Sequence, residues 1–414
     1  MSRLAVVKKA LSNKDVKQLI ENFFSLAVLK VFNLILPFVT LPYLIKTLGF
    51  EQYGAIVLAM ALMQYFQAVT DYGFNLSATR DIAKHRHSQQ QLSYIYSKVM
   101  SAKVFLLAIS LIILLPVIFL VPQFQQDKSI YCLMLLVLVG HTLFPEWFFR
   151  GVEKMRYITV LDLSIKLFFT AGVFLFIHKP EDYWVYPLLN GVGYLVVMFV
   201  AHRLVRKHFS VKFRIVKKQA IRTTLRNGFP LFVNQFMPNL FNNTTNFLVG
   251  MVLGKSAAGA FGATRQVVQL VTVLNSVTTT VFFPYLARKA DRFAIYSKIY
   301  ISYISAVVLI FILIHNFLLS FLRINYQAAS NVFIALALGA WFISIYSVFS
   351  TNYLIVRGYY RAVAKMTVVS SIIGFLSSYP LILIFGVSGG AFNIMMTQGL
   401  MSVLAYLKYR KVRG

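Results

Sequence analysis

The sequence predicts an all-α membrane protein of twelve transmembrane helices in two six-helix lobes. Three observations predict this class: long apolar segments, basic connections on alternate sides of them, and a local repeat between the two halves of the chain. With 58% hydrophobic and only 13% charged residues, the chain is too apolar for a soluble domain.

Each apolar segment is roughly 20–25 residues long, enough for a helix to cross about 30 Å of hydrocarbon. The predicted spans are residues 20–45, 54–78, 99–121, 129–149, 157–178, 184–203, 227–253, 256–286, 297–320, 328–356, 361–385 and 387–408. Alternate connections are short and poor in charge, so neighbouring helices should run antiparallel and no external domain is expected.

The lysines and arginines set the orientation. Seven connections hold 32 of the 41 Lys and Arg, namely residues 1–17, 80–98, 150–156, 203–226, 288–298, 357–365 and 408–414. The connections between them hold one cation or none, which is the positive-inside pattern with both termini in the cytoplasm. Because topology accounts for the net charge of +29, nucleic acid is not an expected partner, whereas membrane lipids are.

A repeat relates the two halves. The stretch 48–55 (LGFEQYGA) recurs as 253–260 (LGKSAAGA), and Arg150-Gly151 recurs as Arg357-Gly358. Two matches at nearly one offset indicate a duplicated six-helix unit. Six is an even number, so both copies enter the membrane in one orientation and a pseudo-two-fold axis runs along the membrane normal. The predicted parts are a basic N-terminal segment 1–19, an N-lobe 20–203, a basic linker 204–226, a C-lobe 227–408 and a basic tail 409–414.

Polar residues at helical spacing mark four predicted spans, the first two of each lobe. In a bilayer such a stripe faces away from lipid. The candidate substrate-binding residues on these stripes are Lys30, Asn33, Gln64, Gln67, Asn239, Asn242, Asn246, Arg265, Gln269 and Thr272. Any single amide could instead join two packed helices. Four matching stripes favour a water-filled cleft between the lobes.

The cations inside apolar segments are the sharpest functional signal. Arg265 is expected near mid-bilayer, where a cation costs roughly 2.5–3.5 kcal/mol. The alternative to a binding role is a structural salt bridge, for which Asp71 is the available carboxylate. Lys103 is near the end of its span and is expected to snorkel. Asp162 and Lys166 are one helical turn apart and should neutralise each other.

The chemistry of the stripes indicates transport. No Ser/His/Asp set, phosphate loop or metal-ligand cluster is present, and Cys132 is the single cysteine, so an enzyme, a cofactor and a metal are not expected. Arg265 and Lys30 outnumber Asp71, and a guanidinium suits phosphate oxygens. Amides and hydroxyls suit sugar hydroxyls. The predicted substrate is therefore anionic, partly saccharide and linked to a lipid.

Three stretches carry a family resemblance: residues 36–54 (LPFVTLPYLIKTLGFEQYG), 71–80 (DYGFNLSATR) and 147–155 (WFFRGVEKM). They resemble the Wzx O-antigen flippases of the multidrug/oligosaccharidyl-lipid/polysaccharide exporter superfamily. The resemblance runs from about residue 20 to the C-terminus and is densest before residue 160. Arg150 stands where that family usually has Gln.

The resemblance implies a bacterial inner-membrane flippase. Its substrate would be an undecaprenyl-diphosphate-linked oligosaccharide, moved from the cytoplasmic to the periplasmic leaflet by alternating access through a cationic cavity. By position, Arg265 and Lys30 would bind the anion, and Asp71 would be the candidate for coupling to H⁺ or Na⁺. The polymerase and the chain-length regulator of the same pathway are further candidate partners.

Three other functions are alternatives to this one. A drug/cation antiporter of the same superfamily should line its cleft with unpaired carboxylates, whereas the stripes here are net cationic. A membrane glycan polymerase or ligase should carry an outward-facing catalytic loop, and the low-charge connections are too short for one. A purely structural membrane scaffold is the third alternative.

Overall fold

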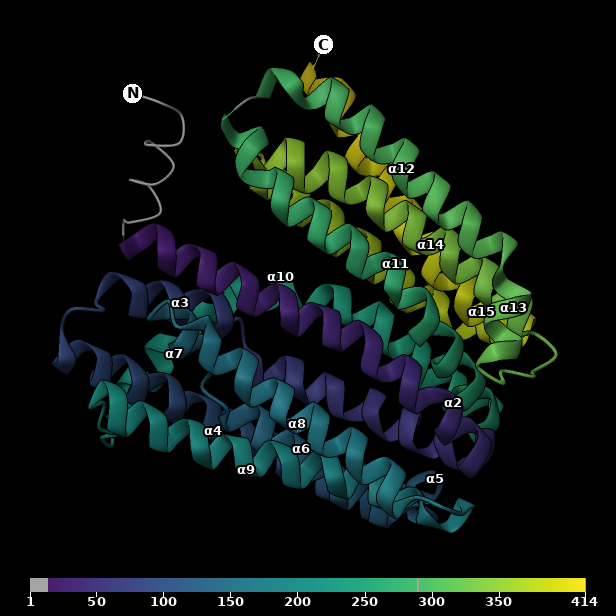
Figure 1. The fold of residues 1–414 in the computed structure, drawn as a ribbon, viewed down its shortest axis with the longest axis horizontal. Coiled ribbons are helices and arrows are strands. Elements are labelled where there is room, and N and C mark those ends of the chain that lie inside the picture. The colour runs from purple at the N-terminus through teal and green to yellow at the C-terminus, as the bar shows by residue number, and fades with distance from the viewer. Residues whose placement is uncertain (1–13, 289, 414) are drawn as a thin grey trace. The chain divides into compact units, whose positions relative to one another are not determined.

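The computed structural model describes residues 14–288 and 290–413, and Figure 1 shows its helices. Residues 1–13 of the predicted N-terminal segment and residue 414 of the predicted tail lie outside the described part. The helices are α2 (Lys14–Asp71), α3 (Phe74–Lys84), α4 (Gln89–Leu120), α5 (Pro122–Gln125), α6 (Lys128–Leu143), α7 (Glu146–Gly151), α8 (Met155–Phe176), η1 (Pro180–Trp184), α9 (Val185–Phe209), α10 (Lys218–Leu253), α11 (Lys255–Arg288), η2 (Ala290–Arg292), α12 (Phe293–Leu313), α13 (His315–Phe321), α14 (Ala329–Phe349), η3 (Ser350–Ile355) and α15 (Tyr360–Arg413). The described residues contain no strand, which confirms the all-α prediction.

Nine stretches of the described residues are long and apolar enough to cross a membrane, which makes the chain a multi-pass membrane protein. Two of them, Val28–Lys84 and Tyr360–Arg413, are 57 and 54 residues long. A glycine corner interrupts each one: Gly49 has φ 73° and ψ 172°, and Gly386 has φ 58° and ψ −138°. Only glycine adopts such angles readily, so these residues form the corners where sequence analysis placed short connections.

Three predicted spans, 54–78, 129–149 and 297–320, are broken where the sequence suggested one continuous helix, and the last is interrupted only at Ile314, between α12 and α13. Span 54–78 breaks after Asp71, because Tyr72 and Gly73 have φ of 43° and 73°. A Cβ on Gly73 would lie 2.9 Å from the Cβ of Leu231, so the backbone passes close to the start of α10. Span 129–149 breaks at Pro145, which has no N–H to continue the helix.

The described residues form two compact units. Unit 1 holds 14–36, 66–177 and 184–232, and within it α6 packs against α4 and α9, and α8 against α9 (Figure 1). Its core includes three consecutive side chains that are fully buried, Trp147, Phe148 and Phe149. The ring of Tyr96 lies 5.8 Å from those of both Trp147 and Phe148. The stretch 147–155 therefore anchors this unit by packing.

Unit 2 holds 37–65, 178–183 and 233–413 apart from residue 289, and within it α14 packs against α11, α12 and α15 (Figure 1). The repeated stretches 48–55 and 253–260 meet here. Gly49 and Gly254 both have positive φ, 73° and 92°. A Cβ on Gly54 would lie 1.8 Å from the Lys255 carbonyl oxygen, and one on Gly259 would lie 2.3 Å from the Phe50 carbonyl oxygen. The matched glycines thus sit backbone against backbone.

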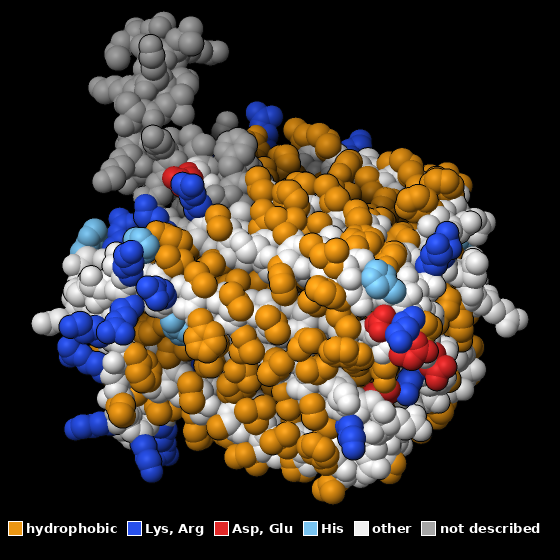
Figure 2. All heavy atoms as spheres, turned by 60° about the horizontal axis from the view of Figure 1, so that its bottom comes forward, with side chains coloured by type: hydrophobic (Ala, Val, Ile, Leu, Met, Phe, Trp, Pro, Cys, Tyr) orange, Lys and Arg blue, Asp and Glu red, His pale blue; other side chains and the backbone are white. Residues whose placement is uncertain are grey.

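The exposed surface agrees with a membrane environment. On the face that Figure 2 shows, hydrophobic side chains cover a broad area, with many Lys and Arg on its left and a smaller group of Lys, Arg, Asp and Glu on its right. On α4, for example, Ile112 and Leu120 are 71% and 74% exposed. Such apolar faces are stable against acyl chains and would be costly against water.

Candidate functional site

Arg265 projects from α11 toward α10 within unit 2. Its guanidinium donates to the backbone oxygen of Asn242 at 3.0 Å and to the Asn242 Oδ1 at 3.2 Å. Within the described residues no carboxylate pairs with it. A guanidinium carries five N–H donors, so most of its donors stay available for an anion. Asp71, the carboxylate that the sequence offers as a salt-bridge partner, pairs with Lys103 within unit 1.

The other predicted residues on the described α10 and α11 do not hydrogen bond to the guanidinium. Asn239 and Asn242 each donate to a carbonyl four residues earlier, at 3.0 Å. The Oδ1 of Asn246 is buried with no hydrogen-bond partner. Thr272 donates to the Gln269 carbonyl at 2.7 Å, and Gln269 is exposed. The structure therefore brings only Asn242 into direct contact with Arg265.

A second group of predicted residues lines a cavity of about 420 Å³ inside unit 1. Lys30, Asn33 and Asp71 all contribute to its wall, although the first two lie in the first half of α2 and Asp71 is its last residue. Gln64 and Gln67 are half-buried on the same helix and do not line this cavity. Sequence analysis placed all five on one cleft, and the structure brings three of them together.

Ion pairs organise the wall of this cavity. The Nζ of Lys103 lies 3.2 Å from Asp71 Oδ1, and Lys103 is 1% exposed. The prediction that Lys103 snorkels is therefore wrong: its side chain turns inward because a carboxylate from the preceding span lies within reach. Asp162 and Lys166 pair at 2.8 Å, as predicted, and Lys166 also donates to Asn33.

His141 is a further residue of this cavity. It lies on α6, lines the same cavity as Asp71, and its Nδ1 is buried without a hydrogen-bond partner. Its ring meets that of Tyr194 edge to face at 6.0 Å. Glu146 also lines the cavity and accepts from Arg150 Nε at 3.0 Å. The cavity thus combines three acids with several cations and a histidine.

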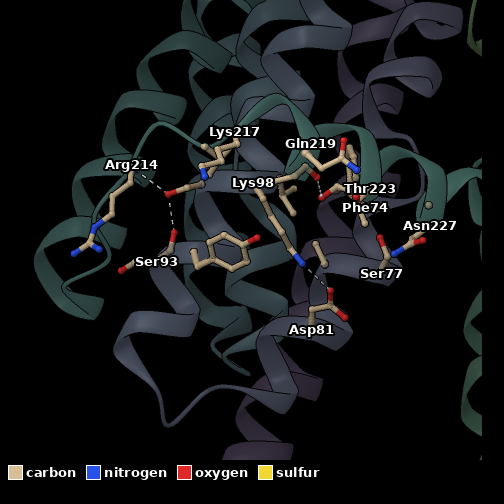
Figure 3. A pocket seen from close by; sticks show the side chains of 18 of the residues that line it. Phe74, Ser77, Asp81, Ser93, Lys98, Arg214, Lys217, Gln219, Thr223 and Asn227 are labelled. Carbon is tan, nitrogen blue, oxygen red and sulfur yellow. Dashed lines mark hydrogen bonds and ion pairs between the residues drawn. The ribbon is translucent and has the colours of Figure 1, made fainter.

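A larger pocket of about 850 Å³, also in unit 1, was missed entirely (Figure 3). It is lined by α3, α4, residues 214–217 and the start of α10. Sequence analysis read the cations of this linker only as a topology signal. The available clue was the group of Ser, Thr, Asn and Gln residues that accompanies them.

Comparisons with known proteins place the chain among transporters. Residues 19–290 match the family described as polysaccharide biosynthesis protein. The chain is 25% identical, over 407 residues, to a protein of Escherichia coli (strain K12) named as an O-antigen transporter; the match covers 96% of this chain and 98% of that protein.

Two solved structures share the fold. The lipid II flippase MurJ in an inward closed conformation has a TM-score of 0.72 at 14% identity, covering 94% of this chain and 87% of that one. An inward-facing multidrug resistance MATE family transporter of the MOP superfamily has a TM-score of 0.70 at 14% identity, covering 93% and 98%. At this identity they show the fold alone, which is that of the superfamily that the sequence resembles.

Proposed function

The chain belongs to the polysaccharide biosynthesis protein family, and on that premise we propose that it is a flippase for lipid-linked polysaccharide repeat units. The named O-antigen transporter aligns with nearly all of the chain, and a lipid II flippase has its fold. These relatives are transporters, in agreement with the prediction that the protein is not an enzyme. The substrate would be a saccharide joined to a lipid through a diphosphate.

The observation that carries this proposal is the state of Arg265. Its guanidinium is held by the amide and carbonyl of Asn242, not by a carboxylate. Uncompensated charge inside a membrane protein is costly and is retained where a ligand supplies the counter-charge. A planar guanidinium can bind two phosphate oxygens at once, so a diphosphate is a suitable counter-ion.

The nearby amides would serve the saccharide. Asn246 offers a buried carbonyl oxygen that lacks a donor, and Asn239, Gln269 and Thr272 share the same two helices. Sugar hydroxyls are both donors and acceptors and would satisfy such groups. A drug/cation antiporter should line its cleft with unpaired carboxylates, whereas α10 and α11 carry Arg265 and no Asp or Glu.

We place this chemistry in a twelve-span protein with two six-helix lobes, 20–203 and 227–408, joined by the linker 204–226. The basic segments 1–19 and 409–414 would lie in the cytoplasm with the linker. The lobes would alternate access to the two leaflets of a bacterial inner membrane, moving the substrate from the cytoplasmic to the periplasmic side. Lys30 would extend the cationic lining, and Gln64 and Gln67 would lie along the path.

Ion coupling would act through the unit 1 cavity. Asp71 there is held by Lys103, and His141 lines the same wall. Protonating Asp71, or binding Na⁺ beside it, would weaken its attraction for Lys103 and so loosen the contact between α2 and α4. The polymerase and the chain-length regulator of the pathway would receive the exported unit or contact its carrier.

Deletion of the protein in its host tests this function. The lipid-linked oligosaccharide should accumulate in the cytoplasmic leaflet, and expression of the wild-type chain should restore export. Arg265→Ala should fail to restore it, whereas the exposed-cation control Lys298→Ala should succeed. Normal export in the deletion strain, with no accumulation of the lipid-linked oligosaccharide, would contradict the proposed flippase function.

A further inference from the structure

The pocket of about 850 Å³ in unit 1 has a wall that is fixed by side-chain hydrogen bonds. Residues 210–217 between α9 and α10 are not helical, so their backbone groups need other partners. The N–H of Lys212 donates to Ser93 Oγ at 3.2 Å, and that of Arg214 donates to Ser97 Oγ at 2.9 Å. Both serines are buried on α4. The linker is therefore held along α4, and the pocket beside it is preformed.

The charge of this pocket is strongly positive. Four cations line it, Arg80, Lys98, Arg214 and Lys217, against the single carboxylate of Asp81. Arg80 and Lys98 each approach that carboxylate at 3.5 Å. Arg214 and Lys217 have exposed side chains, and no described carboxylate pairs with them. Figure 3 shows Lys98 reaching toward Asp81 and the Arg214 guanidinium turned outward at the rim.

Inside the rim the lining is rich in hydroxyl and amide groups. Ser77, Gln219, Thr223 and Asn227 all contribute, and Figure 3 shows Ser77 and Asn227 with their polar ends near each other. Such groups donate and accept hydrogen bonds and so match a hydroxyl-bearing ligand. A volume of this size is within the range of small-molecule sites.

Apolar side chains stand exposed next to the cations. Phe213 is 56% exposed, and Ile215, which also lines the pocket, is 95% exposed. They alternate with Lys212 and Arg214 along the extended linker. Alternating basic and apolar residues are suited to the membrane surface, where the cations meet phosphate and the apolar groups meet hydrocarbon.

We propose that this pocket binds an anionic lipid through its headgroup. The phosphate lies between Arg214 and Lys217 at the rim, the headgroup hydroxyls enter among Ser77, Thr223 and Asn227, and the hydrocarbon chains contact Ile215. The site includes neither Arg265 nor Lys30 and stands without the proposed transport function. Two lipids share the required chemistry: a phospholipid with a hydroxylated headgroup, and a glycosylated polyprenyl diphosphate.

Protection of a single cysteine tests the site. The full-length chain carries Cys132→Ala to remove its native thiol and Thr224→Cys to place one in the pocket lining at a residue that the proposal does not use. Its maleimide labelling rate is measured in mixed micelles with phosphatidylglycerol, with a glycosylated polyprenyl diphosphate, or with phosphatidylcholine. A lipid that saturates the site should slow labelling roughly threefold or more, since only the free fraction reacts. The lipid that protects identifies the natural source.

The matched variants carry Arg214→Gln with Lys217→Gln, or Arg222→Gln at a residue of α10 that does not line the pocket. The first should abolish protection, and the second should retain it. All three cations are exposed, so elution volume and thermal unfolding should match the parent. The proposal is overturned by equal protection from phosphatidylcholine, by no protection from either anionic lipid, or by equal loss in the Arg222→Gln chain.

Discussion

The Nζ of Lys103 lies 3.2 Å from the Asp71 Oδ1, and it joins α4 to the end of α2 inside unit 1. Lys103 is 1% exposed. An ion pair so placed holds its charges only because each compensates the other; removal of one partner leaves an uncompensated buried charge. The pair therefore stabilises the packing of α2 against α4, and its carboxylate is the group at which we propose that a coupling ion binds.

Asp71→Asn should destabilise the protein strongly. It leaves the Lys103 ammonium buried without a counter-charge, a loss on the order of 3–5 kcal/mol in unfolding free energy. The double variant Asp71→Asn with Lys103→Met should recover most of that loss. Thermal unfolding of the purified chains measures the effect, with the exposed Asp291→Asn as control. Equal stability of Asp71→Asn and wild type would show that the pair contributes nothing.

Arg265→Ala should separate transport from stability. The change loses two hydrogen bonds to Asn242 but also removes a cation that costs roughly 2.5–3.5 kcal/mol in a bilayer, so unfolding should stay near that of wild type. Transport should be lost because the anion site is gone. Arg265→Lys keeps the charge without the fork and should be partly active. Full transport by Arg265→Ala would exclude the residue from the site.

Gly54→Ala and Gly259→Ala should each force α2 and α11 apart. The new methyl would lie 1.8 Å or 2.3 Å from a backbone oxygen, closer than atoms can approach. Overpacking of this kind costs roughly 1–3 kcal/mol, and transport should fall with it. Gly399→Ala is the control, since its nearest neighbour would be 3.6 Å away. Wild-type melting and transport in both variants would refute the close approach.

The coupling role of Asp71 predicts a change in gradient dependence. Wild-type transport should slow when the driving H⁺ or Na⁺ gradient is collapsed. The double variant Asp71→Asn with Lys103→Met lacks the carboxylate that would bind the ion, and it leaves no unpaired charge from this ion pair. Its transport should therefore be insensitive to either gradient. Rates with and without a protonophore, and with Na⁺ replaced by choline, decide the matter. A double variant that responds like wild type would place coupling elsewhere.

Local spacing predicted part of this structure well. Asp162 and Lys166 lie one turn apart on a single helix, so their pairing follows from the sequence. The repeat between 48–55 and 253–260 was also informative, because its matched glycines, Gly49 and Gly254, both have positive φ. The repeated Arg-Gly dipeptide was a weaker guide: Gly358 has positive φ, whereas Gly151 is helical and Glu153 takes that conformation instead.

Contacts between residues that are far apart in the sequence could not be predicted from local spacing. Asp71 and Lys103 are on different helices, and hydropathy does not say which face of each meets the other. The linker pocket was missed because positive-inside charge and ligand-binding charge look alike in a sequence. They are separated only when folding sets Arg214 and Lys217 beside Ser77 and Asn227.

The most direct test is transport by the purified chain in proteoliposomes. A fluorescent saccharide on a polyprenyl diphosphate is placed in both leaflets, and the fraction reached by an external quencher or enzyme is followed over time. Wild type and Lys298→Ala should equilibrate the lipid between leaflets, and Arg265→Ala should leave it near the protein-free rate. No movement by the wild-type chain under any imposed ion gradient, or equal movement by Arg265→Ala, would contradict the account.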